Sequence, residues 1–326
     1  MKTGHPGYVP EVEAIKALIE RVDRYQQGKP LLAMIWAVNK KYGDDRGGSQ
    51  AALIAYYGLL SIFPLMLVFF SIVLFVLSPH SSTVVGLDKH LNSFPIIGPS
   101  LKEVESGRLG GSVPGVVVGL LGLAWGAQGL AQTLQHIMNE VWNIPNNERP
   151  GFLPRLATTF KWYGSFGLGI VASTYISSLA QVFNWGPAGP VLAAIPAFVV
   201  NAGLFLMSFR MLTPAEVGTS DLRRGAIAAG VVWTILTGVG LGLVTHQLKH
   251  SSALYGTIST VLAILGFIYL AGRLTLYCAE FNVVRARHLW PRTIIQPPLS
   301  RADKQQLIDM ARREERVEDE TVHVEF

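Results

Sequence analysis

The chain has too little charge for a soluble protein of its length. Only 15% of its 326 residues are Asp, Glu, Lys or Arg, whereas soluble domains carry about a quarter. No charged side chain occurs between Trp162 and Ser208, and this run is long enough to cross a hydrocarbon core of about 30 Å twice. Half of the residues are hydrophobic, and the mean hydropathy is +0.35. The shortage of charge excludes a pair of soluble domains and predicts an integral membrane protein.

Cysteine is almost missing as well, and so is a cleavable leader. The single thiol, Cys278, rules out an intramolecular disulfide. It lies in an apolar segment, where we expect it to act as a small hydrophobe. Residues 1–47 are polar and mixed in charge, without the short apolar core and cleavage site of a signal peptide. We therefore expect the first membrane span to target the chain and to remain in the mature protein.

Six apolar segments are long enough to be transmembrane helices at a rise of 1.5 Å per residue. Their approximate ranges are 51–78, 113–134, 162–183, 190–208, 225–245 and 255–279. The predicted fold class is therefore all-α, a polytopic bundle of six membrane-spanning helices. We expect three parts, namely amphipathic cytoplasmic helices in residues 1–47, the transmembrane domain in 48–284 and a charged cytoplasmic tail in 285–326.

The distribution of Lys and Arg predicts that both ends of the chain lie in the cytoplasm. The N-terminal and C-terminal tails hold eight each, and the second and fourth loops hold three each. The first, third and fifth loops hold three, none and one. Because positively charged loops stay on the cytoplasmic side, we expect a multi-pass protein of the bacterial inner membrane with N-in and C-in topology.

Both tails contain helical patterns. Residues 11–25 place their apolar side chains on one face, so this helix either lies in the membrane interface or packs on the cytoplasmic end of the bundle. Residues 31–42 are expected to form a short helix that leads into the first span. Residues 300–320 form a charged helical pattern with Leu307, Met310 and Ala311 as its only apolar stripe. We expect that segment to be solvated or to face a cytoplasmic partner.

Polar side chains inside the spans are the candidates for a substrate pathway, because a polar group in hydrocarbon is costly unless it faces protein or water. The candidates are Tyr57, Gln128, Asn201, Arg273 and Glu280. Arg273 and Glu280 share a helix face but are too far apart for a direct pair, so each is expected to find a partner elsewhere, such as Gln128 or a loop residue. Arg273 either lines a functional cavity or snorkels to the inner surface as an anchor.

Two other features of the spans bear on mechanism. Pro64 and Pro196 fall in mid-span and predict helix hinges. His246 and His250 have the i, i+4 spacing of half a metal site, but no third ligand accompanies them. We therefore predict no metal and no other cofactor.

The order of several short motifs resembles the bacterial YihY/BrkB inner-membrane family, once described as ribonuclease BN. The resemblance covers about residues 50–287. It is carried by Ala51-Ala52, Tyr56-Tyr57, Ser61, Pro64, Trp125-Gly126, Asn139, Trp142, Pro214, Gly225-Ala226, Trp233, Tyr255-Gly256, Tyr269, Glu280 and Asn282. The run Arg-Leu-Thr-Leu-Tyr-Cys at 273–278 is similar in particular to the YhjD-like branch. The resemblance implies a six-helix inner-membrane transporter and, for that branch, export of lipid or lipopolysaccharide precursors.

The first functional hypothesis is a transporter or lipid flippase in which the five polar residues accept a charged headgroup. Arg273 would pair with phosphate, while Glu280 would set selectivity or couple to protons. The sequence lacks the GxxxxGK[ST] pattern of a phosphate-binding loop, so we expect no nucleotide hydrolysis by the chain itself. The expected partners are membrane lipids and a lipid or anionic amphiphile as substrate, and a homo-oligomer is left open.

Two alternatives belong to other classes. One is a non-transporting membrane scaffold whose tails recruit cytoplasmic partners. The other is a ribonuclease, which would need clustered His and Asp ligands such as HxHxDH. The eight histidines form no such cluster in the sequence, so we predict neither an enzyme nor a nucleic-acid partner.

Overall fold

The computed structural model describes residues 9–76, 128–182, 189–214, 216–250 and 256–326. Every regular element within these ranges is helical, which confirms the predicted all-α class. The helices are α1 (Val9–Gln27), α2 (Pro30–Asp44), α3 (Gly47–Val76), the 3-10 turn η1 (Asn146–Glu148), α7 (Phe152–Val182), α8 (Gly189–Leu212), α9 (Thr219–His250), α10 (Gly256–Ala286) and α11 (Arg301–Arg313). Residues 128–141 are helical as well.

Five of the six predicted spans coincide with long helices, namely α3, α7, α8, α9 and α10. The remaining segment, 113–134, lies mostly outside the described residues. The helices extend beyond the predicted ranges because a hydropathy window ends where charge begins, whereas the helix continues into the polar layer. For example, α7 has 31 residues and is about 46 Å long at 1.5 Å per residue.

Two stretches of the described helices, Ile195–Leu212 and Val261–Ala286, are long and apolar enough to cross a membrane. Only 17% and 22% of these stretches are buried by the rest of the protein. A core helix of a soluble protein would be mostly buried, so these apolar side chains face outward, as expected in lipid. The count of six spans and the N-in/C-in topology stay predictions.

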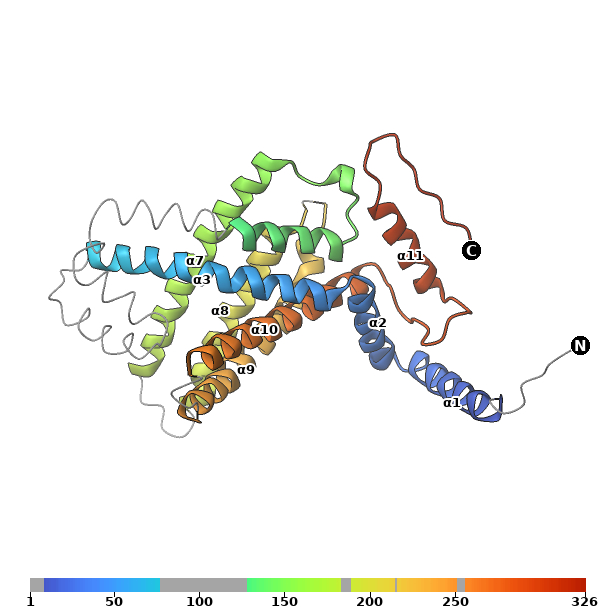
Figure 1. Ribbon diagram of the computed structural model, residues 1–326, viewed down its shortest axis with the longest axis horizontal. Helices are drawn as coiled ribbons and strands as arrows, with labels where there is room; N and C mark the ends of the chain where they lie inside the picture. The colour runs from blue at the N-terminus through green and yellow to red at the C-terminus, as the bar shows by residue number, and fades with distance from the viewer. Residues whose placement is uncertain (1–8, 77–127, 183–188, 215, 251–255) are drawn as a thin grey trace, which may run out of the picture.

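The helices are arranged around α10 (Figure 1). This helix packs against α9, α3 and α2, while α8 packs against both α7 and α9. The buried core lies where residues 128–142 meet α2 and α10, and it includes Ala37, Ile137, Met138, Val141, Trp142, Leu276, Val283 and Val284. The three tail helices α1, α2 and α11 gather at one end of the molecule, so the two tails lie on the same side.

The turn from α2 into α3 is fixed by local chemistry. Pro30 starts α2, because its fixed φ suits the first helical turn. Arg46 has a φ of 53°, which bends the chain sharply before α3. At Gly47 an added Cβ would lie 2.3 Å from the Tyr42 ring, so α3 can begin there only with glycine. The turn therefore sets how α2 projects from the first predicted span.

The expectation of a solvated C-terminal helix is wrong. Helix α11 docks on the protein with its polar face, burying Asp303, Gln306 and Arg313, whereas Leu307 of the apolar stripe remains 37% exposed. The helix also ends at Arg313 rather than near residue 320. Hydrophobic periodicity misses such a helix because its buried contacts are ionic and hydrogen-bonded.

The apolar face of α1 remains uncovered. Ile15, Leu18, Val22 and Tyr25 are 50–63% exposed, and the main helical neighbour of α1 is α2. Its polar side chains hold it in place, since Gln26 donates to the carbonyl of Arg292 at 2.8 Å. Of the two expectations for this helix, the exposed face favours the membrane interface.

We predict that Gly225→Ala destabilises the protein. An added Cβ would lie 2.3 Å from the Cys278 carbonyl oxygen and 2.4 Å from Asn282 Nδ2, so α9 and α10 would have to separate. Overpacking of this kind typically costs about 1–3 kcal/mol. Thermal unfolding in detergent should show a lower Tm for Gly225→Ala, whereas Gly266→Ala on α10, with nothing within 4 Å, should unfold like the wild type. Equal Tm values for both variants would contradict the close approach.

Candidate functional site

Glu280 is buried in the apolar helix α10 and pairs with a lysine of α2. Its side chain is 1% exposed, and Oε2 lies 3.0 Å from Lys41 Nζ. Lys41 is fully buried, contacts Asp45 and donates to the Val141 carbonyl at 2.8 Å. The partner of Glu280 is thus on the helix that precedes the first predicted span, and within the described ranges neither Gln128 nor a loop residue pairs with it.

The pair extends into a network that reaches α11. Arg313 lies 3.1 Å from Asp45 Oδ1 and 3.2 Å from Glu140 Oε2. Glu140 also accepts from Arg149 at 2.7 Å. We call the six side chains the Glu280 cluster: Lys41, Asp45, Glu140, Arg149, Glu280 and Arg313. With three cations and three anions its formal charge is zero, as expected for charges removed from water.

A second cluster surrounds Asp303 of α11 and also involves α2. Oδ1 of Asp303 lies 3.0 Å from Lys40 Nζ and 2.8 Å from Arg292 Nε. Arg292 in turn pairs with Asp44 at 2.6 Å. We call these four residues the Asp303 cluster, which is also neutral. Lys40 and Asp44 serve this cluster, and the next residues along the chain, Lys41 and Asp45, serve the Glu280 cluster, so α2 joins both.

Electrostatics keep two of these buried groups, Lys41 and Asp303, ionised. Burial by itself lowers the pKa of Lys41, but Glu280 and Asp45 outweigh it and raise the pKa above the usual lysine value. Burial tends to raise the pKa of Asp303, but hydrogen bonds from the backbone and hydroxyl of Thr293, from Lys40 and from Ser300 hold it well below the usual range. Both groups therefore carry their charges at neutral pH.

Three of the predicted pathway residues make other contacts. Asn201 on α8 donates to Thr234 Oγ1 on α9 at 3.2 Å. Tyr57 packs edge-on to Tyr56, with ring centroids 5.1 Å apart, and covers Gly129, where a Cβ would lie 2.6 Å from its ring. Gln128 is half-buried. No hydrogen bond or ion pair joins any two of the five candidates in the described part of the chain.

Arg273 lies on the surface of the bundle. Its guanidinium carbon is 5.9 Å from the ring centres of both Tyr42 and Tyr277, and these two rings stack with centroids 4.1 Å apart. Tyr277 also donates to Asn39 Oδ1 at 3.1 Å. Arg273 is therefore held by aromatic rings between α10 and α2, and it does not pair with Glu280, as the spacing predicted.

The predicted hinges lie within continuous helices. Pro196 is inside α8, and Pro64 lies within α3, although its side chain is outside the described part. The side chains of His246 and His250 are also outside it. Among the side chains that are described, no three His, Cys, Asp or Glu groups converge as metal ligands.

Sequence reasoning missed most of the charged residues of both clusters. Lys40-Lys41 and Asp44-Asp45 have the i, i+4 spacing of helical ion pairs. The two lysines lie in the predicted short helix 31–42 and the two aspartates just beyond its predicted end. The contributions of Asp303 and Arg313 had no such signal, because their respective partners Lys40 and Asp45 are more than 250 residues away in the chain.

We expect Lys41→Met to destabilise the protein strongly. It would leave Asp45 and Glu280 buried beside each other without their shared cation, and removing one partner of a buried ion pair costs about 3–5 kcal/mol. The free energy of unfolding in mixed micelles measures the effect. Lys16→Met, at an exposed position of α1, is the matched control. A loss no larger than that of the control would show that the pair is not buried.

Docking of α11 should resist mild acid but not loss of the Asp303 charge. A lowered folded-state pKa contributes stability that is complete above the unfolded value of about 3.9 and is lost only as the pH falls through the folded value. Hydrogen exchange in α11 should therefore be protected alike at pH 7 and pH 5. Asp303→Asn should abolish the protection at pH 7, whereas Asp319→Asn, in the exposed tail, should retain it. Protection in Asp303→Asn would refute this role.

The comparisons with known proteins agree with the predicted family. A family model described as Virulence factor BrkB matches residues 38–299. Inner membrane protein YhjD of Escherichia coli (strain K12) is 23% identical over 294 residues, which cover 83% of this chain and 85% of YhjD. A UPF0761 membrane protein of Photobacterium profundum is 23% identical over 285 residues, which cover 84% of this chain and 87% of that protein.

A Bacillus subtilis relative named ribonuclease-like protein YfkH is 23% identical over 269 residues, which cover 75% of this chain and 92% of YfkH. No solved structure matches the chain. The matched region begins within α2 and ends just before α11, so it contains Lys41 and Glu280.

The names of the relatives support a location in the bacterial inner membrane. With most of its length matched by the family model, the chain belongs to the BrkB family of membrane proteins.

Proposed function

We propose that this protein is a transporter or lipid flippase without nucleotide hydrolysis of its own. The observation that carries the proposal is the buried ion pair between Lys41 and Glu280. An acidic group within an apolar helix is costly and therefore marks a functional position in many membrane proteins. In this protein the counterion of Glu280 is Lys41 of α2, a helix outside the predicted spans. The contact between α2 and α10 at this end of the bundle could therefore open and close.

The Lys41–Glu280 pair is suited to act as a gate because its partners belong to different helices. A proton on Glu280, or an anionic headgroup near Lys41, would compete for the same charge and weaken the contact between α2 and α10. Asp45 would then hold Lys41 alone. Opening of this contact would couple arrival of substrate or proton to movement of α2 against the bundle.

Arg273 is placed to meet a lipid substrate before the gate. Its side chain is exposed on α10, seven residues before Glu280, and its flat guanidinium lies near the rings of Tyr42 and Tyr277. A phosphate in the headgroup layer would form charge-assisted hydrogen bonds with it, while the acyl chains stay in the bilayer. Tyr57, Gln128 and Asn201 would line the route deeper in the bundle.

The second candidate is a membrane scaffold that recruits a cytoplasmic partner. The observation favouring it is the outer face of α11, where Arg301, Lys304 and Arg312 are exposed and make no ion pair with the described residues. Deleting the tails would not separate the two functions, because it would also remove Asp303 and Arg313 from the buried clusters. Substitutions on the outer face of α11 are the better test. Ribonuclease activity is not proposed, since the sequence lacks clustered metal ligands.

Lipid movement in proteoliposomes tests the proposal. Arg273→Ala should slow the transfer of a fluorescent phosphatidylglycerol between leaflets at least tenfold, since a hydrogen bond to a charged group contributes about 1.5–3 kcal/mol. Glu280→Gln should change the rate by weakening the gate. Dithionite quenching measures the transfer, and Lys161→Ala, at an exposed position of α7, is the control. Transfer by Arg273→Ala at the wild-type rate would remove the main support for transport.

The same assay separates transport from scaffolding. Lys304→Glu with Arg312→Glu changes the outer face of α11 without touching a buried charge. A transporter carrying these changes should keep its flux, whereas a scaffold should lose its cellular function. Failure of the wild-type protein to move any lipid or anionic amphiphile would favour the scaffold.

A further inference from the structure

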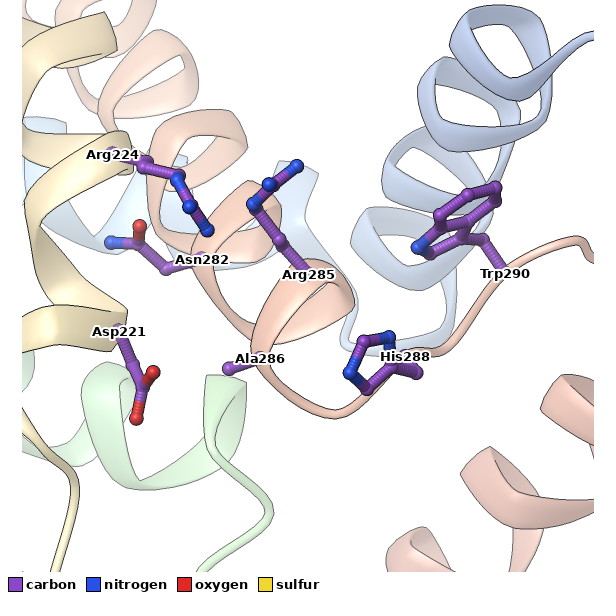
Figure 2. Close-up of a pocket in the computed structure, with 7 residues that line it drawn as sticks. All are labelled: Asp221, Arg224, Asn282, Arg285, Ala286, His288 and Trp290. Carbon is purple, nitrogen blue, oxygen red and sulfur yellow. The ribbon is translucent and has the colours of Figure 1, made fainter.

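A pocket of about 250 Å³ opens between the start of α9 and the end of α10. Figure 2 shows the side chains that line it, with Arg224 from α9 and Arg285 from α10 on one side and Asp221 and His288 on the other. Trp290, just beyond α10, forms a further wall. None of these residues belongs to the Glu280 cluster or the Asp303 cluster.

The two arginines of the pocket lack acceptors. Three other arginines at this end of the molecule, Arg292, Arg313 and Arg287, have carboxylate partners. Among the described residues, neither Arg224 nor Arg285 forms an ion pair or a side-chain hydrogen bond. Moreover, the Nε of Arg285 is buried without an acceptor. A buried donor without an acceptor is unfavourable, so this site is electrostatically incomplete without an anion.

The walls of the pocket are held in place. Asn282 Oδ1 accepts from the Gly225 backbone at 2.6 Å, and its Nδ2 donates to the Leu222 carbonyl at 3.1 Å. These bonds join α9 to α10 at the wall of the pocket. The Asn282 amide thus joins α9 and α10 through both its oxygen and its nitrogen, which fixes the distance between the helices carrying Arg224 and Arg285 before any ligand arrives. Such a site binds with little reorganisation.

We propose that this pocket binds a phosphate group, either free or in the headgroup of a phospholipid. Guanidinium groups present parallel N–H donors that match phosphate oxygens, and two of them line the same side of this cavity. Asp221, on the other side (Figure 2), disfavours a second anion. The pocket lies at the end of the molecule that holds the tails, and Trp290 is a residue type enriched at membrane surfaces. This inference does not depend on transport.

Binding to the purified full-length protein in neutral detergent tests the pocket. Inorganic phosphate is titrated by calorimetry, and retention of phosphatidylglycerol against phosphatidylcholine is compared by native mass spectrometry. Arg285→Gln should weaken phosphate binding, phosphatidylglycerol retention or both at least tenfold. Arg224→Gln, at an exposed position of α9, should act in the same direction. Loss of phosphate binding identifies a site for the free ion, and loss of lipid retention alone identifies a headgroup site.

Arg223→Gln is the matched control, because Arg223 is exposed and adjacent in the chain but does not line the pocket. It removes the same charge and should leave binding unchanged. Asp221→Asn should strengthen binding by removing the opposing charge. The proposal is overturned if neither probe binds, if Arg223→Gln weakens binding as much as Arg285→Gln and Arg224→Gln, or if both pocket variants bind like the wild type.

Discussion

The contact between Lys41 and Glu280 constrains the rest of the described structure. A carboxylate within an apolar helix needs a countercharge, and no described side chain of the spans pairs with Glu280. The countercharge comes from α2, which must therefore lie against α10 at the end of the bundle. Once Lys41 is buried, Asp45 is buried with it, and Arg313 is needed to balance the second carboxylate. The position of the last helix thus follows from one acid on α10.

Helix α2 links the two tails to the bundle through adjacent pairs of identical residues. Lys41 and Asp45 face one cluster, while Lys40 and Asp44 face the other. Buried ion pairs contribute less net stability than an equally well packed apolar contact. Their geometry, however, accepts only one register, whereas apolar surfaces tolerate several. We infer that the clusters specify how α2, α10 and α11 fit together more than they stabilise the protein.

The sequence predicted the helices well and the contacts between them poorly. Long uncharged runs made α3, α8 and α10 evident, since a span of this length has few alternatives in lipid. Glu280 was recognised because its charge is out of place there. Its partner was not, because the two residues are 239 positions apart and only the fold brings them together. The docking of α11 was mispredicted, because a helix buried through Asp303 and Gln306 has no hydrophobic pattern to reveal it.

The docking of α11 also has a consequence for biosynthesis. This helix follows every predicted span in the chain, so all spans are made and can enter the membrane before Asp303 and Arg313 exist. Until then, the charges on α2 and at Arg292 have no complete set of partners and must remain hydrated. The end of the bundle that holds the tails therefore stays open during insertion, and it closes only when translation has passed the last predicted span.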